Sequence, residues 1–103
     1  MKKPLSPREA LHKAAAYCTL CERCVSGVTS KLTAWGIAPD GQHEIIEKLK
    51  EEGFIDETRY CRAFVNDKVK FNRWGRIKIT AALREKHLPQ EYIKEALENI
   101  DED

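Results

Sequence analysis

The sequence predicts an all-α protein of about six helices, arranged as two tandem three-helix repeats. Between its prolines and glycines, apolar residues recur at three- and four-residue steps, which is typical of amphipathic helices. No segment alternates apolar and polar residues in the way that a half-buried strand does. The two halves also share one pattern of apolar positions, so we expect helix-turn-helix-like units in an elongated arrangement.

The first helix is expected to begin at Ser6-Pro7-Arg8-Glu9, a capping box with proline at the first helical position. It should end at residues 23–24, and Gly36 should end a second helix. A third helix should start in the connector around Pro39 and end at Gly53. The apolar positions of these helices are Leu11, Ala14, Ala15, Cys18 and Cys21, then Val25, Val28, Leu32 and Trp35, then Ile45, Ile46 and Leu49.

Asp56 is a suitable N-cap for a fourth helix, which Trp74-Gly75 should interrupt. A fifth helix should end near His87, and Pro89 should start a sixth. The apolar positions of these helices are Tyr60, Phe64, Val65 and Val69, then Ile79 and Leu83 with Ile77 and Ala81 beside them, then Tyr92, Ile93, Ala96, Leu97 and Ile100.

The internal repeat rests on two pairs of matching segments. Val28-Thr29-x-x-Leu32 matches Ile79-Thr80-x-x-Leu83 at an offset of 51, and Ile45-x-x-x-Leu49 matches Ile93-x-x-x-Leu97 at an offset of 48. Units this small cannot bury their apolar faces alone, which favours tandem packing. The predicted division is an N-terminal extension 1–6, a first repeat 7–53 and a second repeat 54–103.

Four cysteines raise the question of a metal site: Cys18, Cys21, Cys24 and Cys61. Cys-x-x-Cys spacing suits zinc or an iron–sulfur cluster. On a helix, however, the first three fall on one stripe, and cysteine packs as a small hydrophobe. We therefore expect core packing, with no metal and no other cofactor. The N-terminus lacks a secretory signal, so reduced thiols and a cytoplasmic location are expected.

The formal net charge of +1 conceals a strongly uneven distribution. Residues 1–58 carry a net charge of −1, residues 59–86 carry +7, and residues 87–103 carry −5. A basic segment with interleaved aromatic residues suits phosphate contacts and stacking on unpaired bases, and equally an acidic protein surface. The candidate binding residues are Arg59, Arg62, Lys68, Lys70, Arg73, Trp74, Arg76, Lys78, Arg84 and Lys86. For Trp74 itself, a core or turn anchor is favoured over a base-stacking role.

A catalytic centre is not expected. His12, His43 and His87 lie on different predicted helices or their ends, and the glycines are scattered at turns. Neither a nucleophile elbow nor a phosphate-binding loop occurs. The longest uncharged stretches are also far too short to span a membrane. These observations favour a non-enzymatic binding protein.

One family resemblance is specific. Phe54-Ile55-Asp56-Glu57-x-Arg59-Tyr60-x-x-Ala63-Phe64-Val65-x-Asp67-Lys68, followed by Trp74-Gly75-Arg76-x-Lys78-Ile79-x-x-x-Leu83-Arg84, resembles the central segment of the RecX family. Upstream, Ala15-Ala16-Tyr17-Cys18 and Lys31-Leu32-x-x-Trp35-Gly36 stand where that family has its first two helices. The resemblance covers about residues 8–100.

The resemblance implies a bacterial cytoplasmic modulator of the RecA recombinase, acting in DNA repair, recombination and the SOS response. Such proteins bind in the groove of the RecA–DNA filament and commonly suppress filament growth, strand exchange, ATPase and coprotease activity. Members usually carry three repeats, so we expect an N-terminal fragment with two. Cys24 stands where many relatives have a serine cap, and Cys61 where alanine is usual, which further disfavours a metal site.

The expected partners are therefore the RecA filament and, weakly and electrostatically, single-stranded and duplex DNA. No membrane partner is expected, and the chain should be a monomer. Two alternatives remain open. An autonomous DNA-binding helical module would bind duplex DNA without RecA, and a metal-dependent redox protein would hold zinc or iron on its cysteines.

Overall fold

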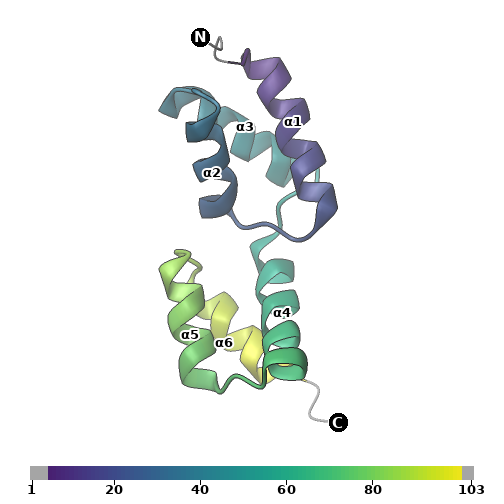
Figure 1. The fold of residues 1–103 in the computed structure, drawn as a ribbon, viewed down its shortest axis with the longest axis vertical. Helices are drawn as coiled ribbons and strands as arrows, with labels where there is room; N and C mark the ends of the chain where they lie inside the picture. The colour runs from purple at the N-terminus through teal and green to yellow at the C-terminus, as the bar shows by residue number, and fades with distance from the viewer. Residues whose placement is uncertain (1–4, 101–103) are drawn as a thin grey trace. The chain divides into compact units, whose positions relative to one another are not determined.

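A computed structural model describes residues 5–100, and this part of the chain is helical with no strand, which confirms the all-α prediction (Figure 1). Contacts within the chain divide it after Asp56 into two compact units of three α-helices each. The helices are α1 (Pro7–Leu20), α2 (Val25–Ala34) and α3 (Pro39–Glu51), then α4 (Glu57–Asp67), a π-helical turn η1 (Lys68–Asn72), α5 (Arg76–Glu85) and α6 (Gln90–Glu98).

The start of α1 follows the sequence prediction, but its end does not. The Ser6 hydroxyl accepts the backbone N–H of Glu9 at 3.2 Å, which caps the helix as expected. The helix ends at Leu20 because Cys21 adopts an extended backbone (φ −168°, ψ 172°). The predicted end at residues 23–24 is therefore wrong, and Cys21 is exposed instead of continuing the buried stripe.

The first unit packs around one apolar cluster contributed by all three helices. Phe54 and Ile55, just beyond α3, also belong to this unit, because their backbone N–H groups bond to the Leu49 carbonyl at 2.8 and 3.2 Å and their side chains pack on the cluster. The buried members of the cluster are Ala10, Ala14, Cys18, Val28, Leu32, Ile37, Ile45, Ile46, Leu49 and Ile55.

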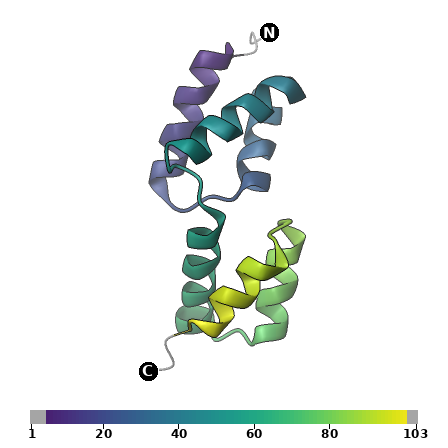
Figure 2. The same cartoon turned by 180° about the vertical axis from the view of Figure 1, so that it is seen from behind.

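In the second unit, α6 packs against both α4 and α5, which Figure 2 shows from behind. Each helix buries its apolar stripe in the interior of the unit, as the helical spacing predicts. The buried side chains of this unit are Cys61, Val65, Ile79, Leu83, Leu88, Ile93 and Ala96.

The C-terminal ends of α2 and α5 share one geometry. In α2, the N–H of Ile37 bonds to the Leu32 carbonyl at 3.0 Å, and Gly36 has a φ of 83°. In α5, the N–H of Leu88 bonds to the Leu83 carbonyl at 3.2 Å, and His87 has a φ of 63°. Both ends are Schellman motifs, which need a left-handed residue after the helix. His87 lies 51 positions after Gly36, the offset of the sequence repeat.

Replacing His87 by glycine should stabilise the second unit by about 0.5–1 kcal/mol, because glycine adopts a positive φ without the steric cost of a Cβ. The reverse substitution at the matched position, Gly36→His, should destabilise the first unit by a similar amount. Urea unfolding followed by circular dichroism measures both changes. A loss of stability in His87→Gly would show that the imidazole contributes more than its backbone conformation costs.

Candidate functional site

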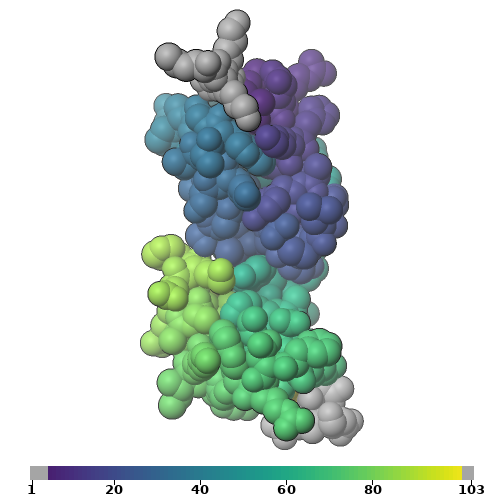
Figure 3. All heavy atoms as spheres, in the orientation of Figure 1, coloured from purple at the N-terminus to yellow at the C-terminus, as the bar shows by residue number. Residues whose placement is uncertain are grey.

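The predicted basic segment, residues 59–86, lies entirely in the second unit, over α4, η1 and α5. In Figure 3 much of the visible surface of that unit is green, the colour of this segment. The structure sorts the candidate residues other than Arg59 and Lys86 into two groups. One group gathers at the turn between α4 and α5, and the other makes contacts between helices.

The turn is closed by a single carbonyl. Beyond Asp67 the helix widens into η1, and the Lys68 carbonyl accepts the N–H groups of both Arg73 and Trp74, the latter at 3.0 Å. Arg73 then adopts the left-handed conformation (φ 54°, ψ 39°), which turns the chain towards α5. Turns of this π type occur frequently at functional sites. We call residues 68–78 the cationic turn, since this stretch carries five basic side chains and no acidic one.

A row of aromatic rings supports the cationic turn. The Tyr60 and Phe64 rings stack with centroids 6.1 Å apart, and the Phe64 and Trp74 rings meet edge to face at 6.3 Å. The ammonium groups of Lys68 and Lys78 lie 4.9 and 4.4 Å from the centroid of the Trp74 ring. These cation–π contacts hold two lysines beside the half-buried Trp74, which anchors the turn.

The remaining cations of the turn, Lys70, Arg73 and Arg76, are exposed. Two large apolar side chains stand among them, with Phe71 80% exposed and Ile77 89% exposed. The sequence predicted Ile77 beside Ile79 and Leu83, and indicated Phe71 as one of the aromatic residues among the cations but not as a candidate binding residue. The helical spacing does indicate that Ile77 is exposed, because it lies two residues before the buried Ile79 and so about 200° away around the helix.

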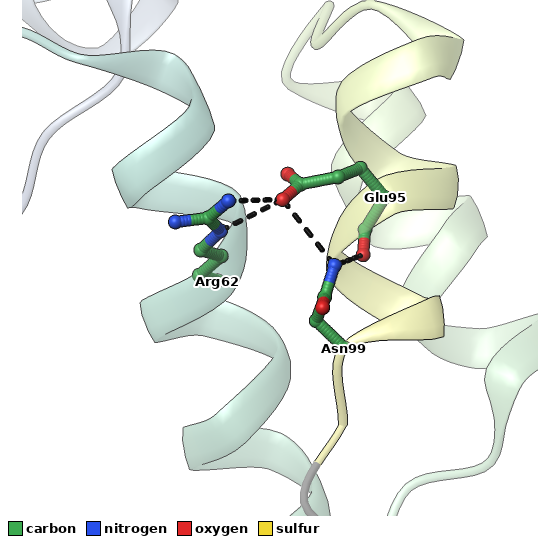
Figure 4. Close-up of polar contacts among 3 residues, drawn as sticks. All are labelled: Arg62, Glu95 and Asn99. Carbon is green, nitrogen blue, oxygen red and sulfur yellow. Dashed lines mark hydrogen bonds and ion pairs between the residues drawn. The ribbon is translucent and has the colours of Figure 1, made fainter.

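Arg62 belongs to the second group, because it joins α4 to α6. Its guanidinium forms an ion pair with the Glu95 carboxylate, and its Nε donates to Glu95 Oε1 at 3.0 Å (Figure 4). Asn99 Nδ2 donates to the Glu95 carbonyl at 2.8 Å and completes the group. Glu95 Oε2 is buried. Arg62 therefore holds two helices together and already has a carboxylate partner.

Arg84 also contacts a neighbouring element. Its Nε and Nη2 donate to Gln90 Oε1 at 3.0 and 2.9 Å, which ties the end of α5 to the start of α6. Arg59 lies exposed on α4, and Lys86 is half-buried just beyond α5. The structure thus brings together Lys68, Trp74 and Lys78 by ring contacts, whereas Arg62 and Arg84 make polar contacts between elements.

The cysteines pack mainly as side chains of the protein interior. Cys18, Cys24 and Cys61 are buried, whereas Cys21 is exposed. Within residues 5–100, no three His, Cys, Asp or Glu side chains come together in a way that could hold a metal ion. In the same part of the chain, no helix has the length and apolar character needed to cross a membrane.

Comparison with known proteins gives one consistent family. A family model described as RecX, second three-helix domain, matches residues 56–97. The regulatory protein RecX of Lactobacillus johnsonii is 26% identical over 103 residues, which is 100% of this chain and 38% of that protein. The regulatory protein RecX of Halorhodospira halophila is 33% identical over 76 residues, which is 74% of this chain and 47% of that protein.

A solved structure has the same fold. The crystal structure of a regulatory protein RecX superposes with a TM-score of 0.79 at 22% identity, covering 91% of this chain and 49% of that one. The chain therefore spans between 35% and 62% of the length of these relatives, the larger share being that of the regulatory protein RecX of Prosthecochloris aestuarii.

Proposed function

Since this chain belongs to the RecX family, we propose that it binds the filament that RecA forms on DNA and regulates RecA there, chiefly by inhibition. It acts as a non-enzymatic, monomeric cytoplasmic protein. The observation that carries the proposal is the cationic turn, where five basic side chains are displayed by a closed backbone turn and a row of aromatic rings. DNA phosphates, or acidic groups on RecA, are its partners.

The construction of the turn supports a binding role for its side chains. A non-glycine residue in the left-handed conformation costs roughly 1 kcal/mol, and glycine would remove that cost at Arg73. Of the other positive-φ positions, two carry glycine, Gly36 and Gly53, and one carries histidine, His87. The guanidinium of Arg73 is exposed, and it contributes a charged, multidentate donor of the kind that recognises phosphate.

Two units on one chain also favour a polymeric target. A filament repeats the same surface along its length, so each unit can contact its own protomer or phosphate group. Linked contacts raise the overall affinity well above that of either contact alone, because the second binding step is intramolecular. A modest contact from each unit is then sufficient.

The test is a titration of this chain into RecA assembled on a single-stranded oligonucleotide, with filament co-sedimentation and ATP hydrolysis measured in parallel. We expect saturable sedimentation with the filament and a falling rate of ATP hydrolysis. The same oligonucleotide without RecA should bind more weakly by at least tenfold. Equal binding to bare DNA, single-stranded or duplex, would overturn the proposal in favour of a DNA-binding module that acts without RecA.

A further inference from the structure

One face of α5 carries an exposed apolar centre between two arginines. Ile77 is 89% exposed, and Ala81 follows it one turn later, also exposed. These two residues line an open hollow of about 330 Å³ together with Arg76, Thr80 and Arg84. An apolar centre with a polar, charged rim is the usual composition of a protein-binding surface.

Comparison with the matched helix α2 shows that a helix in this position of the repeat does not need exposed apolar and cationic residues in order to pack. The offset of 51 pairs Ile79 and Leu83 with Val28 and Leu32, and all four are fully buried. The same offset places serine or threonine in α2 opposite four of the five residues that line the hollow. The matched pairs are Val25 with Arg76, Ser26 with Ile77, Thr29 with Thr80, Ser30 with Ala81 and Thr33 with Arg84. The matched helices α2 and α5 thus bury equivalent residues, but of these two only α5 exposes an apolar, cationic face.

Arg84, at one end of this face, is preorganised for binding. Arg84 uses two of its N–H groups on Gln90 Oε1, which fixes the plane of the guanidinium. A guanidinium has five N–H donors, so three remain for a carboxylate on a partner. Preorganised donors lose little side-chain entropy on binding. Arg76, at the opposite end of the hollow, is exposed and supplies the second charge.

We propose that this face of α5 docks an acidic protein segment, in which an aliphatic or aromatic side chain enters the hollow at Ile77 and flanking carboxylates pair with Arg76 and Arg84. The inference rests on the proposed function, since the segment belongs to the protein part of the filament. Nucleic acid is the less suitable occupant, because a phosphate backbone gains nothing from an exposed isoleucine at the centre of the contact. The α5 face shares Arg76 and Ile77 with the cationic turn, so Lys70, Arg73 and Lys78 are the residues of the turn that remain for DNA.

The test compares Ile77→Asp and Ala81→Asp with the matched variant Ser30→Asp in the first unit. Ile77 is the second residue of α5, where an acidic side chain favours the helix, so the fold should be retained. Co-sedimentation with RecA filaments on single-stranded DNA should weaken at least tenfold for both α5 variants. Ser30→Asp should stay within twofold of the unsubstituted chain. Anisotropy of the labelled oligonucleotide without RecA should remain within twofold for Ala81→Asp and Ser30→Asp, the two variants that lie outside the cationic turn.

Four other outcomes would overturn the inference. Undiminished filament binding by Ile77→Asp and Ala81→Asp would remove the α5 face while leaving the proposed function intact. An equal loss of binding to bare DNA by Ala81→Asp, which lies outside the cationic turn, would make the face a nucleic-acid contact. A dimer of the unsubstituted chain that Ile77→Asp converts to a monomer would assign the face to self-association. Failure of the unsubstituted chain to bind filaments would overturn the proposed function together with the inference. This outcome differs from a failure of the inference alone, because in that case the unsubstituted chain still binds filaments.

Discussion

Replacing Lys70, Arg73 and Lys78 together by glutamate should weaken binding to the RecA–DNA filament by at least about a hundredfold at low salt. Hydrogen bonds to charged groups contribute roughly 1.5–3 kcal/mol each. Three lost contacts, even at the low end of that range, exceed the roughly 2.7 kcal/mol that corresponds to a hundredfold change. The variant also places negative charge opposite phosphate, which adds repulsion to the lost attraction.

Salt dependence separates phosphate contacts from contacts with acidic protein groups. Each phosphate contact on single-stranded DNA contributes about 0.7 to the slope of log K against log salt. If all three cations meet phosphate, the slope should become shallower by about 2 in the triple variant. Isothermal titration or anisotropy over a range of potassium chloride concentrations measures this slope.

The fold of the triple variant should be retained. Lys70 and Arg73 are exposed, and Lys78 is the third residue of α5, where glutamate favours the helix dipole. The main loss is the cation–π contact of Lys78 with Trp74, about 0.5–1 kcal/mol. The matched control reverses three exposed cations of the first unit, Arg8, Lys48 and Lys50. Equal loss of binding in this control would assign the effect to net charge and contradict a localised site.

The helices could be predicted because their signals are local. Ser6 and Pro7 mark the start of α1, and apolar steps of three and four residues identify the buried stripe of each helix. The end of α1 was harder to predict, because residues 21–24 carry no glycine or proline to stop a helix. The Arg23 side chain lies beside the last turns of α1. Its guanidinium carbon is 3.7 Å from the centroid of the Tyr17 ring, and its Nε donates a hydrogen bond to the Tyr17 carbonyl.

The candidate site was predictable as a charge pattern but not as a geometry. The excess of positive charge over residues 59–86 is evident in the sequence. No characteristic residue pattern marks a π-helical turn. The sequence therefore did not indicate that the Lys68 carbonyl would close the turn or that Arg73 would adopt the left-handed conformation. The contacts of Arg62 with Glu95 span 33 positions and depend on the packing of α4 against α6, which no local pattern reveals.

The largest effect on stability is expected from Leu83→Ala, which should destabilise the second unit by about 2–5 kcal/mol. Leu83 is fully buried, and truncation leaves a cavity that a well-packed core closes only in part. At roughly 0.05–0.15 kcal/mol per residue, a three-helix unit has only a few kcal/mol of stability in total. The variant should therefore be largely unfolded in α4–α6 at 25 °C and should lose filament binding with it.

The internal repeat supplies both the counterpart and the control for this prediction. Leu32 is the matched residue of the first unit and is equally buried, so Leu32→Ala should unfold α1–α3 instead. Leu20 is 78% exposed, and Leu20→Ala should change stability by less than about 0.5 kcal/mol. Hydrogen exchange read by mass spectrometry reports each unit separately. Loss of protection confined to the substituted unit would establish that the two units fold independently. Loss of protection across both units in either variant would instead show that the repeats fold as one cooperative block, because each unit then depends on the apolar core of the other.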